Sequence, residues 1–308
     1  MGKAEKRFRS SGKLMLSGEY LVLHGAWSLA VPTLLGQSLK VLETRRNGTL
    51  TWKTRVLSTP WMNCEIDPDS WQVMQASKPD KAQHLLQLLK AASEICGDTQ
   101  WLKGKEVVSE VEFDIEWGLG SSSSLISNIA WWAGIDPFQL SMAVSGGSGY
   151  DIACARSDQP LLYKRGDAEP IYKPVAFLPP FHMHLAFVYL GKKQDSASSV
   201  RNYLNKALVL EKDISDVSSI TEKLSRAGEL EEFEELVQEH EHILSRILGL
   251  PPVKQGLFHD YAGGVKSLGA WGGDFVLITM HREWPEVKAY FAAKGLDVLI
   301  PYYEMVQT

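Results

Sequence analysis

Hydrophobic and polar residues alternate along three stretches of the first half of the chain, and this period of two predicts β-strands. Residues 38–41 and 50–56 alternate on either side of Asn47-Gly48, a dipeptide typical of a hairpin turn. Residues 107–115 alternate again. The pattern therefore predicts that the chain opens with strands, two of them paired as a hairpin.

Two other patterns complete this half. Residues 13–22 are apolar on both sides of Gly18-Glu19-Tyr20, which predicts a buried strand, a turn and further strand. Residues 81–95 carry their apolar side chains mostly on one helical face, which predicts an amphipathic helix. Asp136-Pro137 is typical of a helix start and predicts a short second helix ending at Gly146.

The second half of the chain has a different pattern of hydrophobic and polar residues. A proline-rich stretch over residues 174–180 indicates a domain boundary. Beyond it we predict a strand over 184–190, three amphipathic helices within 199–248, a strand over 275–280, a helix over 283–293 and a strand over 298–303. This succession predicts an α+β domain.

A glycine-rich turn that opens directly into a helix carries most of the candidate chemistry. Gly118-Leu119-Gly120 is followed by four serines and an apolar run from Leu125 to Trp132. Glycines allow positive φ and a close approach of the backbone to a ligand, and the first N–H groups of a helix attract phosphate. We interpret this stretch as a phosphate loop. The alternative that its serines simply cap a buried helix stays open.

Composition narrows the classes of protein that fit. The chain has 308 residues, of which 44% are hydrophobic and 22% charged, and its net charge is −5. That size fits two domains, and the acidic balance favours neither nucleic acid nor a membrane as a partner. Three unevenly spaced cysteines indicate neither a disulfide framework nor a zinc site, and we find no signal-peptide pattern and no membrane span. We expect a cytoplasmic protein, and its oligomeric state cannot be read from these features.

Four segments carry recognisable motifs. Residues 13–20 read Lys-Leu-Met-Leu-Ser-Gly-Glu-Tyr, residues 118–123 Gly-Leu-Gly-Ser-Ser-Ser, residues 148–151 Ser-Gly-Tyr-Asp and residues 266–274 Lys-Ser-Leu-Gly-Ala-Trp-Gly-Gly-Asp. In this order they resemble the motifs of the GHMP kinase superfamily, which includes galactokinase, homoserine kinase, mevalonate kinase and phosphomevalonate kinase. The run Gly-Tyr-Asp-Ile-Ala at residues 149–153 is similar to that of a subgroup named for those five letters.

The resemblance implies an α+β fold of two domains. Residues 1–178 would form a nucleotide- and phosphate-binding domain like domain 2 of ribosomal protein S5, and residues 179–308 a ferredoxin-like domain. It also implies a kinase that uses ATP and Mg²⁺ to phosphorylate an alcohol or phosphate group of a small acidic substrate, with mevalonate or phosphomevalonate as the leading candidates.

The resemblance also assigns roles to residues. Backbone N–H groups would hold the nucleotide phosphates at Gly118, Leu119, Gly120, Ser121, Ser122 and Ser123, and the Ser122 hydroxyl would bind Mg²⁺. Asp151 would orient or deprotonate the substrate hydroxyl, and Lys13 would keep Asp151 ionised and steady the charge of the transferred phosphoryl group. Substrate contacts would come from Glu19, Tyr20, Ser148, Gly149, Lys192, Ser196, Ser198, Arg201, Gly269, Ala270, Gly272 and Gly273.

Each of these residues also has a structural interpretation. Lys13 can be a surface lysine at a strand start, and Asp151 can cap the helix that follows it. The chain also departs from the family pattern. The interval from Ser122 to Asp151 is short, Trp271 replaces a usual glycine, and no acid occupies the place of the family's Mg²⁺-binding glutamate, although Asp136 is near it. These departures favour the alternatives, a non-catalytic relative that binds a ligand or partner, or a kinase for homoserine or a sugar.

Overall fold

The computed structural model describes residues 5–44, 48–167, 169–193, 196–206 and 208–308. Contacts divide the chain into two compact units. The first consists of Met1–Gly12, Leu35–Ile115 and Leu119–Arg156, and the second of Lys13–Leu34, Glu116–Gly118 and Ser157–Thr308. Strands β1 (Glu5–Ser17) and β2 (Ser28–Glu43) contribute residues to both units, so each unit combines segments that are separate in the sequence. The domain boundary expected after residue 178 stays a prediction.

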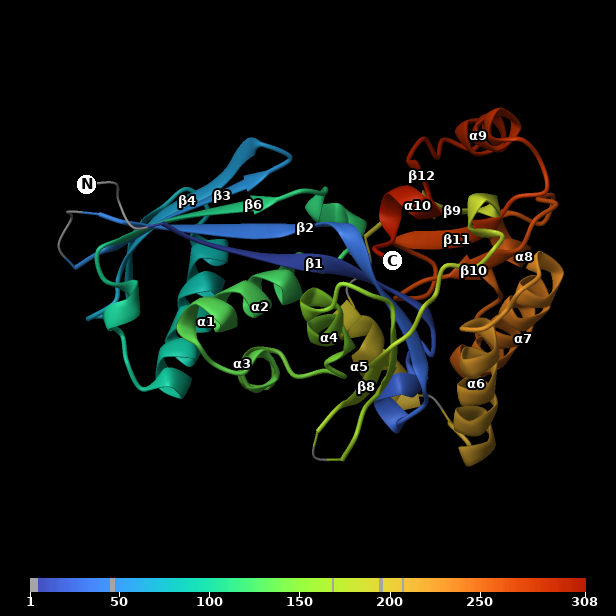
Figure 1. Ribbon diagram of the computed structural model, residues 1–308, viewed down its shortest axis with the longest axis horizontal. Coiled ribbons are helices and arrows are strands. Elements are labelled where there is room, and N and C mark those ends of the chain that lie inside the picture. The colour runs from blue at the N-terminus through green and yellow to red at the C-terminus, as the bar shows by residue number, and fades with distance from the viewer. Residues whose placement is uncertain (1–4, 45–47, 168, 194–195, 207) are drawn as a thin grey trace. The chain divides into compact units, whose positions relative to one another are not determined.

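The first unit is a sheet with helices on one face (Figure 1). Its strands follow the order β5-β4-β3-β6-β2, and β1 pairs with β2. The β3–β6 pair is parallel and the pairs β2–β6, β3–β4 and β4–β5 are antiparallel. The strands are β3 (Leu50–Val56), β4 (Thr59–Asp67), β5 (Gln72–Ala76) and β6 (Lys105–Val111), and the helices are α1 (Pro79–Cys96), α2 (Ser121–Ala133), α3 (Pro137–Val144) and α4 (Tyr150–Arg156), with 3₁₀ turns at Gln100–Leu102 and Ile115–Trp117.

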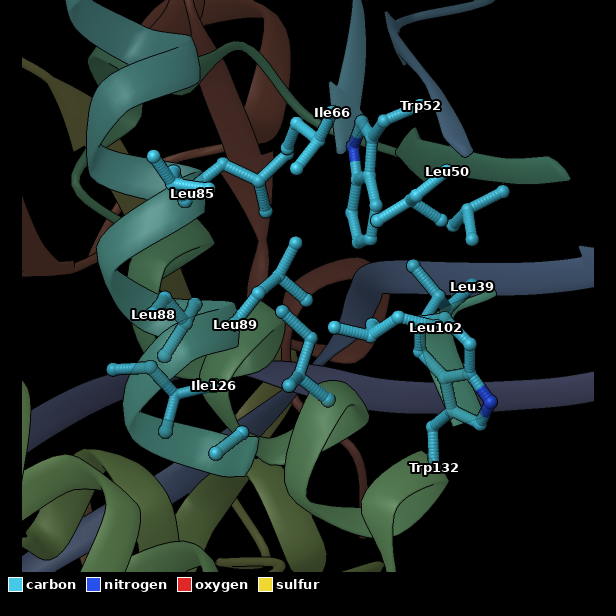
Figure 2. Packing of buried hydrophobic residues seen from close by; sticks show 14 of the residues in the cluster. Leu39, Leu50, Trp52, Ile66, Leu85, Leu88, Leu89, Leu102, Ile126 and Trp132 are labelled. Atoms are coloured by element: carbon cyan, nitrogen blue, oxygen red, sulfur yellow. The ribbon is translucent and has the colours of Figure 1, made fainter. Parts of the chain in front are cut away.

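The core of the first unit lies between this sheet and α1. Figure 2 shows Leu85 and Leu89 of α1 facing Leu50 and Trp52 of β3, and Trp52 is only 1% exposed. The predicted amphipathic helix over residues 81–95 is thus confirmed, because its apolar stripe is the face that α1 buries. Burial of such large side chains contributes about 1.5–3 kcal/mol each.

The predicted hairpin around Asn47-Gly48 is wrong. β6 lies between β2 and β3, so the two alternating segments are not neighbours; Asn47 itself lies outside the described residues. The hairpin of this region joins β3 to β4 through Leu57 and Ser58, whose φ values are 49° and 64°. Such turns usually take Asn or Gly at these positions, and the sequence therefore carried no signal for this one.

The second unit contains an antiparallel sheet in the order β10-β11-β9-β12. It also contains the N-terminal part of β2, which pairs with β7, and β7 pairs with β8. The strands are β7 (Leu161–Lys164), β8 (Ile171–Pro174), β9 (Leu185–Tyr189), β10 (Val265–Ser267), β11 (Phe275–Thr279) and β12 (Leu299–Pro301). The helices are α5 (Ser196–Lys206), α6 (Glu211–Leu224), α7 (Leu230–Leu248), α8 (Val253–Leu257), α9 (Trp284–Ala292) and α10 (Tyr302–Met305), with a 3₁₀ turn at His182–His184.

The strand, three helices, strand, helix and strand predicted for the second half are all present, in that order, and α8 and β10, which were not predicted, lie between the third helix and the next strand. Helices α6 and α7 pack against each other, and α7 and α8 contact β10. One expectation for this unit is wrong, because a 3₁₀ helix (Leu21–His24) follows the Gly18–Tyr20 turn where further strand was predicted. Among the described residues, no helix combines the length and apolarity that crossing a membrane requires.

Candidate active site

The glycine-rich turn belongs to the first unit from Leu119 onward and starts helix α2. Gly120 has a φ of 89°, and its carbonyl oxygen accepts the Ser124 backbone N–H at 3.0 Å, the first hydrogen bond of the helix. The preceding N–H groups have no partner within the helix, as at any helix start. The predicted turn-into-helix geometry is therefore present, and it has the electrostatic character of an anion site.

The serines of this turn divide into two pairs. Ser123 and Ser124 are buried. The Ser123 hydroxyl donates to the Gly120 carbonyl at 2.9 Å, and the Ser124 hydroxyl lies 2.8 Å from Oε1 of Gln37 and 3.0 Å from the Gly120 carbonyl. Their side chains therefore stabilise the turn, but they do not cap the helix as the alternative predicted, because the N-cap is Gly120 and has no side-chain cap hydrogen bond. Ser121 is half-buried and Ser122 is exposed, so the second pair keeps its hydroxyls accessible. Leu119 is fully buried and offers a ligand its backbone alone.

A cavity of about 600 Å³ lies in the first unit and includes Ser121 and Ser122 in its wall. The residues of this wall also include Trp52, Trp61 and, from α1, Lys81. The Trp52 indole N–H donates to the Thr54 hydroxyl at 3.0 Å, so that ring is fixed. The cavity has the usual size of a small-molecule site and combines aromatic walls with polar groups at a helix start.

Asp151 lies in the first turn of α4, which packs against α2 within the same unit. Its carboxylate accepts the backbone N–H of Ile152 at 3.1 Å, a contact that fits the capping interpretation. Asp151 is half-buried, so its carboxylate stays partly accessible. Gly149 has a φ of 84° and, with Ser148, forms the loop that leads into α4.

Lys13, Gly118 and Asp274 lie together in the second unit. The Lys13 ammonium donates to the Gly118 carbonyl oxygen at 2.9 Å. A Cβ added to Gly118, which has a φ of 68°, would lie 2.6 Å from Cγ of Asp274. The structure thus joins Gly118, the first residue of the predicted phosphate loop, to the N-terminal motif and to the end of the C-terminal glycine motif, and the close approach requires glycine.

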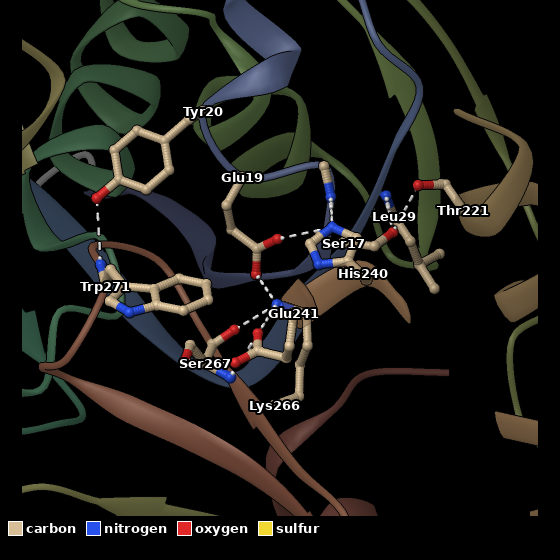
Figure 3. A network of polar contacts seen from close by, with 11 residues as sticks. Ser17, Glu19, Tyr20, Leu29, Thr221, His240, Glu241, Lys266, Ser267 and Trp271 are labelled. Atoms are coloured by element: carbon tan, nitrogen blue, oxygen red, sulfur yellow. Dashed lines mark hydrogen bonds and ion pairs between the residues drawn. The ribbon is translucent and has the colours of Figure 1, made fainter. Parts of the chain in front are cut away.

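The glycine loop over residues 269–273 is held from the turn at Gly18–Tyr20. The Tyr20 hydroxyl accepts the backbone N–H of Trp271 at 3.1 Å, as Figure 3 shows. Gly269 and Gly272 have φ values of 64° and 81°, Ala270 is buried, and the Gly273 N–H donates to the Ala270 carbonyl at 3.3 Å. Both loops were predicted to contact substrate, and the structure brings them into direct contact with each other.

Glu19 belongs to a buried ionic network in the second unit (Figure 3). The Lys266 ammonium lies 2.7 Å from the Glu19 carboxylate and 3.2 Å from that of Glu241, and it donates to the Ser267 carbonyl at 2.5 Å. Lys266 is 1% exposed and both acids are 3% exposed. Glu19 was predicted as a substrate contact, but its burial favours a structural role.

Burial shifts the pKa values of the ionisable side chains in this network. It raises the pKa of the Glu19 and Glu241 carboxyls above their ordinary values, although Lys266 opposes the shift. Burial also disfavours the Lys266 ammonium, but the two carboxylates outweigh it and raise its pKa. Burial, together with Lys266, lowers the pKa of His240 well below its ordinary value. The Gly18 N–H donates to Nε2 of His240 at 3.0 Å, which requires a neutral ring with its proton on Nδ1.

Glu241 and His240 are not among the site residues predicted from the sequence. A signal was present, because both residues continue the apolar stripe of α7 that includes Phe233, Val237 and Leu244. Polar side chains on such a stripe become buried and need partners.

The predicted substrate residues Lys192, Ser196, Ser198 and Arg201 lie in or just before α5, whose Tyr203 ring packs with its centroid 4.9 Å from that of Tyr20. The Arg201 guanidinium donates to the Ser198 hydroxyl at 2.8 Å, and Lys192 is exposed while its carbonyl accepts the Asp274 N–H at 2.9 Å. The Ser196 side chain lies outside the described part of the chain. On the same helix, Tyr203 is 4% exposed and its hydroxyl has no hydrogen-bond partner in the part of the chain that the structure describes.

The described residues do not form a metal site of their own. No three His, Cys, Asp or Glu side chains among them are placed to hold an ion. Asp136, the acid nearest the place of the family's glutamate, accepts the Phe138 and Gln139 backbone N–H groups at 2.7 and 3.3 Å and so caps α3. Mg²⁺ characteristically binds through few carboxylates and substrate phosphates, and Ser122 is the one predicted ligand at the cavity.

Solved structures with the same fold include several small-molecule kinases. The mevalonate kinase of Methanococcus jannaschii matches with a TM-score of 0.72 at 15% identity, over 96% of this chain and 97% of that one. Streptococcus pneumoniae phosphomevalonate kinase, in complex with phosphomevalonate and AMPPNP, matches at 0.70 and 17% identity, over 95% and 98%. Lactococcus lactis galactokinase complexed with galactose matches at 0.64 and 12% identity, over 98% and 93%. No protein-family model matches the chain, and no curated protein matches it in sequence.

These matches cover nearly the whole chain, and their proteins share the GHMP kinase fold. The chain therefore has the two-domain α+β fold of the GHMP kinase superfamily, as its motifs predicted. At these identities the likeness establishes the fold, and the reaction has to be argued from the site.

Proposed function

We propose that this protein is a GHMP-type phosphotransferase that binds ATP in the cavity of the first unit and phosphorylates a small acidic substrate. The observation that carries the proposal is the cavity of about 600 Å³ whose wall includes Ser121 and Ser122 at the start of α2. A nucleotide needs a phosphate cradle and an adjoining apolar space for its base, and this cavity offers both in one unit. The shared fold adds support.

The cavity wall suggests how the nucleotide lies. Its phosphates would meet the free N–H groups at the start of α2, where the helix dipole favours negative charge. The base would lie toward the half-buried Trp61, because aromatic rings bind each other by offset or edge-on stacking. Lys81 in the same wall adds a positive charge for the polyphosphate. Mg²⁺ would be held mainly by these phosphates and by the Ser122 hydroxyl, and when bound it would neutralise phosphate charge.

In this proposal Asp151 and Lys13 would take the two roles that phosphoryl transfer requires. Asp151 would accept the proton of the substrate hydroxyl as its oxygen forms a bond to the γ-phosphorus, while the bond from that phosphorus to the β–γ bridging oxygen breaks and ADP leaves. Where the acceptor is a phosphate group, its oxygen attacks without that proton transfer. Lys13, which donates to the Gly118 carbonyl, would steady the charge on the transferred group.

Mevalonate and phosphomevalonate are the leading substrates. The supporting observations are the motifs of residues 13–20 and 266–274, and the matches to the M. jannaschii and S. pneumoniae enzymes. Homoserine and sugars are the next candidates, since galactokinase shares the fold. A non-catalytic relative is the second candidate function, because the described residues lack an acidic metal cluster and Asp136 is committed to capping α3.

The test is a coupled ADP-release assay with Mg·ATP and mevalonate, phosphomevalonate, homoserine or galactose, beside calorimetry with Mg·ATP alone. We expect turnover with one of them and loss of 10²–10⁴-fold in kcat for Asp151→Asn, with nucleotide affinity nearly intact, because general-base catalysis contributes about that much. Asp136→Asn is the matched control and should keep turnover.

Three outcomes would contradict parts of this proposal. Nucleotide binding without turnover on any substrate would favour the non-catalytic relative. Absence of both would remove the kinase proposal, and full activity of Asp151→Asn would remove that residue from the mechanism.

A further inference from the structure

Two loops of the second unit are tied to each other by direct contacts. The turn at Gly18–Tyr20 and the loop over residues 269–273 are linked where the Tyr20 hydroxyl accepts the Trp271 N–H at 3.1 Å. A second link precedes the loop by a few residues, where Lys266 contacts Glu19 at 2.7 Å. These loops are more than 240 residues apart in sequence, since Glu19 and Lys266 are separated by 247 positions.

Helix α7 holds both loops from one side through two consecutive residues. His240 accepts the Gly18 backbone N–H at 3.0 Å and therefore holds the turn. Glu241 accepts the Ser267 hydroxyl at 2.9 Å and the Ser267 backbone N–H at 3.2 Å, and therefore holds the end of β10, which leads into the glycine loop. In Figure 3, Glu241 lies beside Ser267 and Lys266, and His240 lies beside Glu19.

The turn that His240 holds has little freedom of its own. Gly18 has a φ of 89°, and a Cβ there would lie 2.6 Å from Cβ of Ser28. Tyr20 adopts a φ of 62°, a conformation that costs a residue with a side chain and persists only where its surroundings enforce it. The His240 contact is one of the interactions that enforce it, so removing the contact should release the turn.

We propose that His240 and Glu241 of α7 are positioning residues that fix the Gly18–Tyr20 turn and the 269–273 loop against each other. Their consequence for catalysis rests on the proposed function, because it requires these loops to contact substrate. The mechanical coupling of the two loops does not depend on the proposed function. A role limited to filling the core would affect overall stability without linking the two loops.

The variant pair His240→Leu and His240→Gln tests the coupling. Leucine removes the acceptor of the Gly18 N–H, whereas the glutamine carbonyl can replace Nε2. Amide hydrogen exchange read by mass spectrometry should rise at least tenfold in His240→Leu both in the peptide containing residues 18–20 and in the peptide containing residues 268–274. His240→Gln should remain close to the wild type in both peptides.

Arg246→Gln is the matched control on the same helix. It breaks the Arg246–Asp213 ion pair, 2.5 Å long, which joins α7 to α6 and involves neither loop. If Arg246→Gln raises exchange in the two loops as much as His240→Leu, or if His240→Leu affects the 18–20 peptide alone, the proposal is overturned. Glu241→Gln provides a second route if His240→Leu does not fold, and it should loosen the 268–274 peptide and then the 18–20 peptide.

Steady-state kinetics of the His240 variants test whether the coupling of the two loops affects catalysis. With the substrate that turns over best, His240→Leu should lower kcat/KM for that substrate about 100-fold, as a misplacement of binding groups does. The KM for ATP should change less than twofold, because the nucleotide cavity lies in the other unit, and His240→Gln should restore kcat/KM. An equal rise of both KM values would overturn the assignment. If no substrate turns over, the proposed function fails, and the coupling of the two loops is then tested by hydrogen exchange alone.

Discussion

Replacement of Lys266 by methionine should destabilise the second unit by about 3–5 kcal/mol at pH 8. Methionine keeps an unbranched apolar side chain in the space of the lysine stem, so little packing is lost. The ammonium disappears, however, and with it the contacts to Glu19 at 2.7 Å and to Glu241 at 3.2 Å. A hydrogen bond to a charged group contributes about 1.5–3 kcal/mol, and removal of one partner of a buried ion pair costs about 3–5 kcal/mol.

The pH dependence of this loss is the sharper signature. The pKa values of Glu19 and Glu241 are already raised by burial, and the loss of Lys266 raises them further. An acid whose folded pKa exceeds its unfolded pKa takes up a proton on folding, so the variant gains stability as the pH falls. Each proton taken up contributes about 1.4 kcal/mol per pH unit, and lowering the pH from 8 to 5.5 should recover up to about 3 kcal/mol.

Thermal unfolding followed by circular dichroism at both pH values measures this prediction. For a unit of 150–250 residues, a loss of 3–5 kcal/mol lowers Tm by roughly 6–20 °C. Lys288→Met, at an exposed position of α9, is the control and should change stability by less than about 0.5 kcal/mol. Adding Glu241→Gln to Lys266→Met should recover part of the loss, since one uncompensated carboxylate is removed. A loss that is the same at pH 8 and pH 5.5 would refute the reasoning.

Three further predictions concern single contacts. Gly118→Ala should lower the free energy of unfolding by roughly 2–5 kcal/mol in thermal melts, because of left-handed strain and the collision with Asp274. Gly272→Ala, which has no atom within 4 Å of its added Cβ, should lower it by only about 1–2 kcal/mol. Equal losses in the two variants would contradict the collision. The lowered pKa of His240 makes the unfolded state bind an extra proton below pH 6.5, so His240 contributes a loss of stability of up to about 1.4 kcal/mol per pH unit as the pH falls. The raised pKa values of Glu19 and Glu241 act in the opposite direction in both the wild type and His240→Gln. The stability difference between wild type and His240→Gln should therefore change with pH below 6.5, and a constant difference would refute it. Tyr203→Phe removes a buried hydroxyl that has no partner in the described chain, and it should change the free energy of unfolding by less than about 0.5 kcal/mol. A raised substrate KM in this variant would place the hydroxyl at the substrate. A loss of stability above about 2 kcal/mol would show that the hydroxyl has a structural partner.

Part of the site could be predicted from the sequence because its signals are local. The turn from Gly118 to Ser122 and the helix after it are specified by adjacent residues, and the apolar stripe of α1 follows from helical periodicity. The motifs also predicted the fold, and the solved structures of GHMP kinases confirmed it. The assignments of individual residues to nucleotide and substrate remain predictions.

Other features could not be predicted because no local rule describes them. The Asn47-Gly48 hairpin failed because strand order depends on where β6 inserts, and the Leu57-Ser58 turn carries none of the usual turn residues. Glu19 appeared to be a turn residue open to substrate, whereas the fold buries it against Lys266, 247 positions away.

The sequence by itself determined the glycine turn that opens α2 at Gly118–Ser122, the helices and the family of folds, because glycine conformations and apolar periodicity act between near neighbours. The tertiary structure alone decided that His240, Glu241 and Lys266 form one buried network beneath two distant loops. Charge becomes costly only when water is excluded, and the exclusion of water is a property of the packed chain.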